Sequence, residues 1–262
     1  MFPKLDLHTH SRFSDGKQTL QEIFNEAQRN DLMAVAVTDH HTNTSFLDAY
    51  DHVNGLEEIR VMKEKCRTIS EGSQTRFLLG VEADIIDLDG CLNIKPEIAA
   101  EVDFVIASLH IIPGVETRWE KLVTGDVGVD RKKVVSRCFQ AEIAALRNGQ
   151  VDVLGHPMYV VSAGKYLKSV ADLANGLLSE LVETAAKRGV AVEINGQFYR
   201  DLTQPTNYLT LFRMCLENGV KLSTGTDAHQ PLFVGDLSKI HNTLMELEAR
   251  SSDLYNPAGN VV

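Results

Sequence analysis

Short runs of apolar and β-branched residues recur along the chain, and most of them are separated by segments whose apolar positions repeat with helical spacing. The runs cover Lys4–His8, Met33–Thr38, Arg76–Val81, Asp103–Ala107, Val151–Leu154, Val190–Ile194 and Val220–Ser223. Near-continuous apolar character is typical of strands buried on both faces, as in parallel sheets. Seven such strands alternating with helices predict a parallel α/β fold. A seven-stranded barrel and an open doubly wound sheet both fit this pattern.

Several of the predicted helices have recognisable ends. Thr19 followed by Glu22 is a capping box, which predicts a helix over Thr19–Asn30. Glycine favours the left-handed backbone that often follows the last turn of a helix. Three further helices are predicted to end in this way: Asp130–Asn148 at Gly149, Leu177–Arg188 at Gly189 and Thr206–Asn218 at Gly219.

Length and composition add limits to this picture. The chain has 262 residues, of which 44% are hydrophobic and 24% charged, and barrels of this class commonly have about 250 residues. We therefore expect a single domain over residues 1–262. No apolar run approaches the roughly 18 residues of a membrane span, and no N-terminal apolar segment suggests export. We expect a cytoplasmic protein with no membrane partner.

Charge and cysteine content exclude other classes. The formal net charge is −10, which disfavours long nucleic acid as a partner because both would be negative. The four cysteines are scattered and form no pair with metal-ligand spacing. They favour ordinary packing in a reduced compartment over disulfides or a structural zinc site.

The distinctive feature of the chain is the set of polar residues at the ends of the predicted strands. Six of the nine histidines occupy such positions, together with three carboxylates. In a parallel barrel the carboxyl ends of all strands lie at one end, where catalytic groups gather. The set that we expect to meet there is His8, His10, Asp15, His40, Glu82, His110, His156, Asp227 and His229.

Imidazole nitrogen and carboxylate oxygen are the ligands of divalent ions such as Zn, Mn and Fe. His8 and His10 are two residues apart on a strand, so both rings point to one face, and Asp227 and His229 repeat this spacing. Nine ligands are too many for one ion, so two or three ions are predicted, with Glu82 as the residue that bridges a pair. His41, His52 and His241 fit no strand end, and we expect structural roles for them. Asp39, beside His40, is expected to help position the ligands without binding a metal itself.

These residues resemble the PHP family, the polymerase and histidinol phosphatase domains. The matching motifs extend from Asp6 to about Gly235: Asp6-x-His8-x-His10 with Ser14-Asp15-Gly16, Thr38-Asp39-His40, Gly80-Val81-Glu82, Ser108-x-His110, Gly155-His156-Pro157 and Thr226-Asp227-Ala228-His229. The stretch Val192–Asn195 also fits the single-domain phosphatases and the PHP domain of family X polymerases. The resemblance implies a distorted seven-stranded, TIM-like (β/α)7 barrel with a trinuclear metal site.

The resemblance also implies roles for individual residues. His8, His10, Glu82 and Asp227 would hold the first ion, and Glu82 would bridge to a second ion held by His110 and His156. Asp15, His40 and His229 would hold the third. Glu82, Asp227 and His229 are expected to be the catalytic members of the set. Mn, Fe and Zn all remain open, although the oxygen ligand at Asp15 slightly favours Mn or Fe.

The expected reaction is hydrolysis of a small phosphomonoester by a metal-activated hydroxide. A phosphate substrate also requires cationic or amide donors, and five residues in loops near the strand ends are candidates: Arg12, Arg118, Lys165, Asn195 and Arg200. Arg200 and Lys165 are the preferred pair. A phosphodiesterase or nuclease using the same cluster is the alternative within enzymes, and a metal-binding scaffold without turnover is the alternative outside them. The absence of an appended polymerase domain favours a free-standing enzyme.

Overall fold

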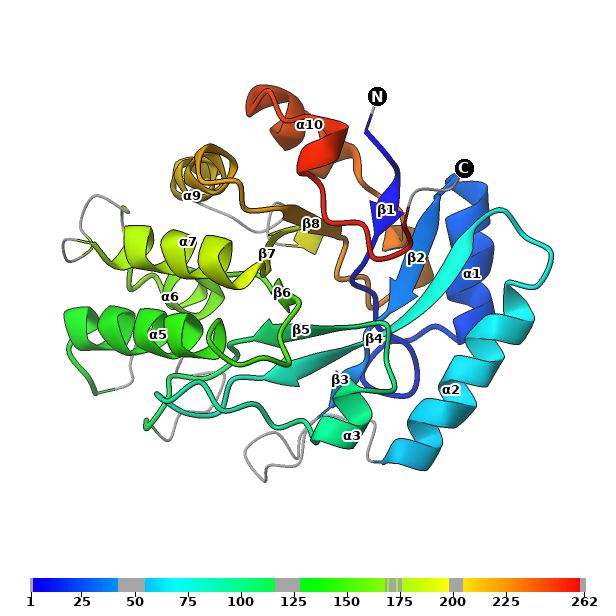
Figure 1. Ribbon diagram of the computed structural model, residues 1–262, viewed down its shortest axis with the longest axis horizontal. Helices are drawn as coiled ribbons and strands as arrows, with labels where there is room; N and C mark the ends of the chain where they lie inside the picture. The colour runs from blue at the N-terminus through cyan, green and yellow to red at the C-terminus, as the bar shows by residue number, and fades with distance from the viewer. Residues whose placement is uncertain are drawn as a thin grey trace.

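The structure is a computed structural model (Figure 1). It describes residues 2–41, 55–115, 128–167, 169, 173, 176–197 and 205–259.

The strands form a nearly closed barrel in which every pairing of the described strands is parallel. The strands are β1 (Leu5–Asp6), β2 (Ala34–Val37), β3 (His40–His41), β4 (Arg76–Asp84), β5 (Phe104–Ser108), β6 (Val153–Leu154), β7 (Ala191–Asn195) and β8 (Leu222–Gly225). The hydrogen-bonded order is β1-β2-β4-β5-β6-β7-β8. Strand β3 resumes the path of β2 along β4 after a break at Thr38 and Asp39.

The first and last strands meet at the closure of the barrel. The Leu7 N–H donates to the Thr224 carbonyl at 2.8 Å, and Thr9 forms a parallel bridge with Ala228. The barrel alternative predicted from the sequence pattern is therefore confirmed over the open sheet. Counting β2 and β3 as one interrupted strand, the barrel has seven strands.

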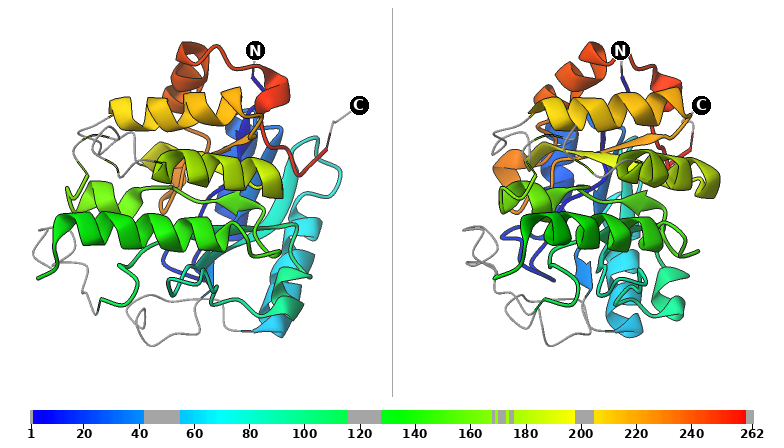
Figure 2. Two further views of the ribbon diagram at one scale, coloured as in Figure 1. Left: turned by 60° about the vertical axis from the view of Figure 1, so that its left-hand side comes forward. Right: turned by 90° about the vertical axis from the view of Figure 1, so that its left-hand side faces the viewer.

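The helices surround the barrel (Figures 1 and 2). They are α1 (Leu20–Arg29), α2 (Leu56–Ile69), α3 (Pro96–Ala99), α5 (Arg131–Ala145), α6 (Tyr159–Ala163), α7 (Leu177–Arg188), α9 (Pro205–Glu217) and α10 (Ser238–Glu246), with short 3-10 turns η3 (Pro231–Phe233) and η4 (Ser251–Asp253). The capping box of α1 is present: the Glu22 N–H donates to Thr19 Oγ1 at 3.2 Å, and the Thr19 N–H donates to Glu22 Oε2 at 2.8 Å.

The predicted helix ends are right in two cases and wrong in one. Gly189 caps α7 with φ +70°, and Gly219 follows α9 with φ +73°. Helix α5, however, ends at Ala145 and is capped by Leu146, well before Gly149. The chain leaves the helix through tight turns, in which the Arg147 and Asn148 N–H groups donate to the Ala144 and Ala145 carbonyls. These turns satisfy the last helical carbonyls without a glycine.

Side chains of each strand alternate between two apolar clusters. On β4, Phe77, Leu79, Val81 and Ala83 belong to the larger cluster, which includes the helices. The smaller cluster contains no helix residue and draws on six strands: Leu5, Leu7, Ala34, Ala36, Leu78, Phe104, Ile106, Val153 and Ala191. This smaller cluster fills the barrel interior. Tyr255 packs against it from the C-terminal segment, with its ring 6.1 Å from that of Phe104.

The inward positions change from apolar to polar along the strand direction. Leu78 belongs to the interior cluster, but Glu82, four residues on, is a buried carboxylate. Likewise Ala191 is apolar and Glu193 is not. The barrel is therefore filled with hydrocarbon at the amino ends of its strands and with polar groups at their carboxyl ends, as is usual for enzymes of this architecture.

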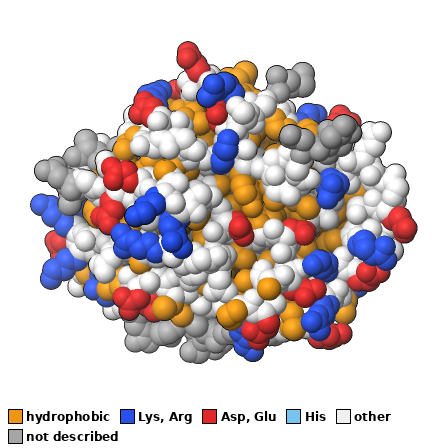
Figure 3. Space-filling view, viewed as in Figure 1, with side chains coloured by type: hydrophobic (Ala, Val, Ile, Leu, Met, Phe, Trp, Pro, Cys, Tyr) orange, Lys and Arg blue, Asp and Glu red, His pale blue; other side chains and the backbone are white. Residues whose placement is uncertain are grey.

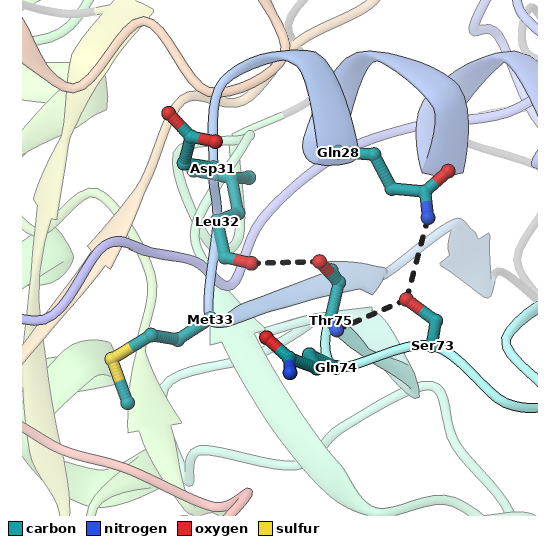
Figure 4. Close-up of a pocket in the computed structure, with 7 residues that line it drawn as sticks. All are labelled: Gln28, Asp31, Leu32, Met33, Ser73, Gln74 and Thr75. Atoms are coloured by element: carbon teal, nitrogen blue, oxygen red, sulfur yellow. Dashed lines mark hydrogen bonds between the residues drawn. The ribbon is translucent and has the colours of Figure 1, made fainter.

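A pocket lies at the opposite end of the barrel from those polar groups. Its volume is about 470 Å³, and it lies where α1 leads into β2 and where the chain enters β4 (Figure 4). Thr75 Oγ1 donates to the Leu32 carbonyl at 2.9 Å there, and Gln28 Nε2 donates to Ser73 Oγ at 3.3 Å. Because it lies at the amino ends of β2 and β4, this pocket is separate from the strand-end residues.

Side chains of both charge signs are interspersed over the face shown in Figure 3. In the described part of the chain, no helix combines the length and the apolar character that crossing a bilayer requires.

The interior cluster predicts a large effect of Phe104→Ala. Phe104 is 1% exposed and central to the barrel filling, so its truncation should lower the free energy of unfolding by about 3–5 kcal/mol. Urea titration at a fixed metal content measures the change. Leu232→Ala is the matched control, because Leu232 is 81% exposed and its truncation should change the free energy by no more than about 0.5 kcal/mol. Equal effects of the two substitutions would contradict this account of the core.

Candidate metal centre

The nine strand-end residues that the sequence predicts to converge lie close together in the structure. His8, His10 and Asp15 follow β1, His40 opens β3, and Glu82 lies in β4. The remaining members follow β5, β6 and β8. Their side chains form one connected network of contacts shorter than 4 Å.

Glu82 is the centre of this network. Its Oε2 lies 2.9 Å from His40 Nδ1, 3.4 Å from His8 Nε2 and 3.5 Å from His10 Nε2. Its Oε1 lies 2.9 Å from His156 Nε2 and 3.5 Å from His110 Nε2. Five imidazoles from four segments of the chain thus surround a carboxylate that is 1% exposed.

The other two carboxylates extend the network on one side. Asp227 Oδ1 lies 3.2 Å from His10 Nε2 and 3.8 Å from His8 Nε2. Asp15 Oδ2 lies 3.2 Å from His229 Nε2, and Asp15 Oδ1 lies 3.7 Å from both His10 Nδ1 and His40 Nε2. Every ligand predicted from the sequence is therefore within reach of at least one other.

Burial divides the network into an inner and an outer part. His8, His10, Glu82 and His156 are at most 4% exposed. The side chains of Asp15, His40, His110 and His229 are 16–28% exposed. A molecule from solvent therefore approaches past these four outer residues.

Three of the imidazoles are fixed with Nε2 directed into the network. Nδ1 of His8 lies 2.8 Å from Glu193 Oε1, Nδ1 of His110 lies 2.6 Å from Asp84 Oδ1, and Nδ1 of His229 lies 3.0 Å from the Asp227 carbonyl. These oxygens only accept, so Nδ1 carries the proton and the Nε2 lone pair is left for a metal.

The sequence patterns assign no role to Asp84 or to Glu193, although Glu193 lies within the stretch Val192–Asn195 and both lie two residues from a polar strand-end residue. The spacings Glu82-x-Asp84 and Glu193-x-Asn195 place each pair on one face of its strand. That spacing is the signal that identifies them. Tyr159 is a further neighbour, with its ring 5.2 Å from that of His156 and 6.3 Å from that of His110.

Asp39 supports the centre differently from its neighbour His40. Its carboxylate accepts the Ser11 N–H at 2.6 Å and the Ser11 and Ser14 hydroxyls at 2.5 Å each. These bonds fix the loop that carries Asp15. Gln18 adds a second restraint, because its Nε2 donates to the His10 and Ala228 carbonyls at 2.6 Å.

Two of the ligands have strained backbone. Asp227 has φ +55° and His156 has φ +22°, and Met158, shortly after His156, has φ +63°. Such conformations of residues other than glycine are unfavourable, and they persist where the surroundings impose them. Here the imposing groups include buried carboxylates: the His156 N–H donates to Glu193 Oε2 at 2.7 Å, and the Met158 N–H donates to Glu142 Oε1 at 3.0 Å.

The ligand side chains alter each other's protonation. Burial alone raises the pKa of Glu82, but the imidazoles of His40, His8 and His110 outweigh it and hold this pKa well below its usual range. Burial lowers the pKa of His40, and the carboxylates of Glu82 and Asp15 reverse this and raise it to about 10. For His10, burial together with His229 and His40 lowers the pKa to about 4. Protons and metal ions therefore compete for the same nitrogens.

The donor set fits divalent metal ions. His10 Nδ1 is buried and makes no hydrogen bond, which is unfavourable unless another partner binds it. Three sets of side chains converge closely enough to share an ion: His10, Asp15, His40 and His229; His8, His10 and Asp227; and His40, Glu82 and His110. All donors are imidazoles or carboxylates, as Zn, Mn and Fe require.

The predicted substrate-binding residues that the structure describes differ in their relation to the centre. Arg12 is exposed, and its Nε donates to the Lys17 carbonyl at 2.8 Å. Lys165 is also exposed, and its carbonyl accepts from Arg131. Asn195 is buried, and its Nδ2 donates to Glu193 Oε2 and Asp227 Oδ2 at 3.2 Å. Arg118 and Arg200 lie outside the described residues. The role of these five in substrate binding stays a prediction.

The two other histidines that the structure describes are not members of the network. His41 is buried in β3, and His241 packs beside Phe2 with the two rings 5.9 Å apart. His52 lies outside the described residues.

Comparisons with known proteins agree with this arrangement. The sequence model of the PHP domain matches residues 6–197. A probable phosphatase of Acetivibrio thermocellus is 27% identical over 246 residues, which cover 93% of this chain and 87% of that protein. The DNA polymerase/3'-5' exonuclease PolX of Bacillus subtilis is 29% identical over 238 residues, 89% of this chain and 35% of the longer enzyme.

Among solved structures, a histidinol phosphate phosphatase of Lactococcus lactis has a similar fold. It is complexed with zinc, L-histidinol and phosphate. The TM-score is 0.69 at 18% sequence identity, and the match covers 98% of this chain and 100% of the other. At this identity the likeness shows a shared fold.

Glu142 predicts a pH dependence of stability that is separate from the ligands. Burial raises the pKa of Glu142 to about 8 from an ordinary value of 4.5. Between these values the folded protein holds a proton that the unfolded chain has released. The free energy of unfolding therefore falls as pH rises, by at most about 1.4 kcal/mol per pH unit. Glu142→Gln keeps an acceptor for Met158 and cannot titrate, so it should remove this slope.

Urea titrations of the parent and Glu142→Gln from about pH 5 to about pH 8 measure the effect. Titration of the ligands is common to both proteins and cancels in the difference. A difference that stays constant across the series would contradict the assignment of a raised pKa to Glu142.

Proposed function

Because this chain belongs to the PHP domain family and is a metal-dependent phosphoesterase, we propose that it hydrolyses a small phosphomonoester at a cluster of three divalent metal ions. The observation that carries this proposal is the buried carboxylate of Glu82 with five imidazole nitrogens 2.9–3.5 Å from its oxygens. In the described part of the chain, no lysine or arginine pairs with Glu82. The arrangement suits a carboxylate that bridges cations.

The proposed distribution of ligands uses Glu82 as the bridge. His8, His10, Glu82 and Asp227 hold the first ion; Glu82, His110 and His156 the second; Asp15, His40 and His229 the third. The convergent sets support the first and third groups directly. His40 lies between the second and third groups, because its Nδ1 faces Glu82 and its Nε2 faces Asp15.

Zinc, manganese and iron all suit a site of imidazoles and carboxylates without thiolates. Bound ions of this kind make coordinated water more acidic and neutralise charge that develops on phosphate oxygens. The protein's own part is to fix the ligands and to exclude excess water. The inner residues His8, His10 and His156 form the closed side of the centre, and Asp15 and His229 form part of the open side.

Glu82, Asp227 and His229 are the proposed catalytic members. His229 is suited to a position beside the substrate, because its side chain is 28% exposed while its Nδ1 is held by the Asp227 carbonyl. The phosphate oxygens would meet the outer residues first. Arg200 and Lys165 are the preferred additional donors, with Arg12, Arg118 and Asn195 as further candidates.

A small substrate is favoured over a polymer. The chain carries a formal charge of −10, and long nucleic acid is negative as well. Histidinol phosphate is one candidate, supported by the ligand of the Lactococcus lactis enzyme. Other sugar and nucleotide monophosphates have the same reacting group.

Phosphodiester cleavage is the second candidate. It is favoured by the similarity to a polymerase that is also named a 3'-5' exonuclease. The same cluster would serve this reaction, since a diester has one fewer charge to neutralise and otherwise presents the same phosphorus. A scaffold without turnover is disfavoured because all nine ligand positions are filled.

Removal of metal should destabilise the protein and abolish its activity. Ions bound to the folded state add about 3–4 kcal/mol when their free concentration is 100 to 1,000 times Kd. Dialysis against a strong chelator should therefore lower Tm, and addition of Mn or Zn should restore it. Elemental analysis should find more than one ion per chain in active protein. A single ion in fully active protein would contradict a multinuclear centre, and full activity after verified removal would contradict metal dependence.

Assays with p-nitrophenyl phosphate and bis-p-nitrophenyl phosphate separate the two activities. We expect turnover of the monoester, dependent on added Mn or Zn, and at least about tenfold slower turnover of the diester, a difference in activation free energy of about 1.4 kcal/mol. Preferred turnover of the diester would support the second candidate. A screen of phosphorylated metabolites, histidinol phosphate included, then ranks substrates by kcat/KM.

A further inference from the structure

We propose that Glu193 is a positioning residue that sets the geometry of the metal centre without binding a metal. The proposal rests on the proposed function, because it concerns how the ligands are held for the ions. Glu193 lies on β7, which contributes no predicted ligand, and its side chain is 1% exposed. In the part of the chain that the structure describes, no lysine or arginine forms an ion pair with it.

Each oxygen of Glu193 accepts a hydrogen bond associated with a different ligand. Oε1 lies 2.8 Å from His8 Nδ1. Oε2 accepts the His156 backbone N–H at 2.7 Å and Asn195 Nδ2–H at 3.2 Å. Asn195 Nδ2 also lies 3.2 Å from Asp227 Oδ2. One carboxylate on β7 is therefore connected to ligands that follow β1, β6 and β8.

The bond to His8 selects the form of the imidazole that can bind a metal. A carboxylate accepts from Nδ1–H, so the lone pair of His8 is on Nε2. That nitrogen faces Glu82 at 3.4 Å and His10 Nε2 at 3.1 Å. The negative charge on Glu193 also makes the imidazole a stronger donor to a cation.

The hydrogen bond from the His156 N–H to Glu193 stabilises an otherwise unfavourable backbone conformation of His156. His156 has φ +22°, and its ring meets Glu82 Oε1 at 2.9 Å. Without an acceptor for its N–H, relaxation of this segment would move the ring. Asn195 transmits the same restraint to Asp227, which has φ +55°.

The contact between His8 and Glu193 depends on a glycine in the neighbouring strand. A Cβ at Gly225 would lie 2.7 Å from Glu193 Oε1 and still closer to the His8 side chain. Glycine at this position of β8 therefore allows His8 and Glu193 to approach. A role in packing alone would not require a charged group whose hydrogen bonds go to His8, to His156 and to Asn195, the residue that binds Asp227.

The test compares Glu193→Gln and Glu193→Asp with the parent. Glutamine has the size of glutamate but one acceptor oxygen, so it can accept from His8 or from His156 and must turn its NH₂ toward the other donor. Aspartate retains two acceptor oxygens on a shorter side chain. Competition with a chromogenic chelator measures the affinity for Zn, independently of turnover. We expect Glu193→Gln to bind Zn about 10–100-fold more weakly, and Glu193→Asp to recover part of this loss.

Glu142→Gln is the matched control. Glu142 is also a buried glutamate that accepts a backbone N–H, and glutamine can keep that bond. Its Zn affinity should equal that of the parent. If Glu193→Gln binds Zn as tightly as Glu142→Gln, the positioning role is overturned, whatever the two substitutions do to Tm. A parent protein that binds no Zn, Mn or Fe would instead overturn the proposed function.

A measurement on the parent keeps the proposal testable if Glu193 variants do not fold. Long-range ¹H–¹⁵N correlation spectra of the Zn-loaded protein report which ring nitrogen of each histidine carries the proton. We expect His8, assigned by loss of its signals in His8→Gln, to be protonated at Nδ1, with this proton shifted downfield by the bond to a carboxylate. An Nδ1 proton of His8 without such a shift would overturn the inference.

Discussion

The structure depends on the electrostatic balance around one buried carboxylate. Glu82 without its imidazoles would be a charged group in a low-dielectric interior, and the imidazoles without Glu82 would crowd one another. Their ring centroids lie as close as 4.5 Å for His10 and His40 and 4.9 Å for His110 and His156. Divalent ions at the proposed sites would remove both problems at once, since they would attract Glu82 and occupy the lone pairs of the rings. The barrel provides the six strand ends from which these groups converge.

Much of this arrangement is predictable from local patterns. Buried strands appear as short apolar runs, and the register of each strand end places a histidine or carboxylate where the chain leaves the sheet. His8-x-His10 and Asp227-x-His229 point to one face because of the two-residue period of a strand. The closure of the barrel is not local: it follows from Leu7 and Thr224, which are distant in sequence, and both the barrel and the open sheet satisfy the same periodicity.

The residues that went unpredicted are those whose roles depend on a partner far along the chain. Asp84 and Glu193 look like ordinary polar residues until His110 and His8 are placed beside them. Asp39 was expected to support ligands and does so through Ser11 and Ser14, which no spacing rule identifies. The predicted end of α5 is wrong for a different reason. Tight turns after Ala145 satisfy the last helical carbonyls, so the helix ends without a glycine cap. Arg12 and Lys165 lie in loops, where side chains follow no periodic pattern. Their predicted role in substrate binding therefore rests only on their positions near strand ends.

The pairing of β1 with β8 has a kinetic consequence. The first ion's proposed ligands come from the beginning of the described chain and from its last strand, so the complete site does not exist until the barrel closes. During synthesis, the early histidines emerge without Asp227 and His229 and offer metals only a partial set of ligands. Contacts of such long sequence separation form slowly. Full occupancy of the proposed site is therefore coupled to closure of the barrel, and ions bound there would stabilise the closed barrel without directing its assembly.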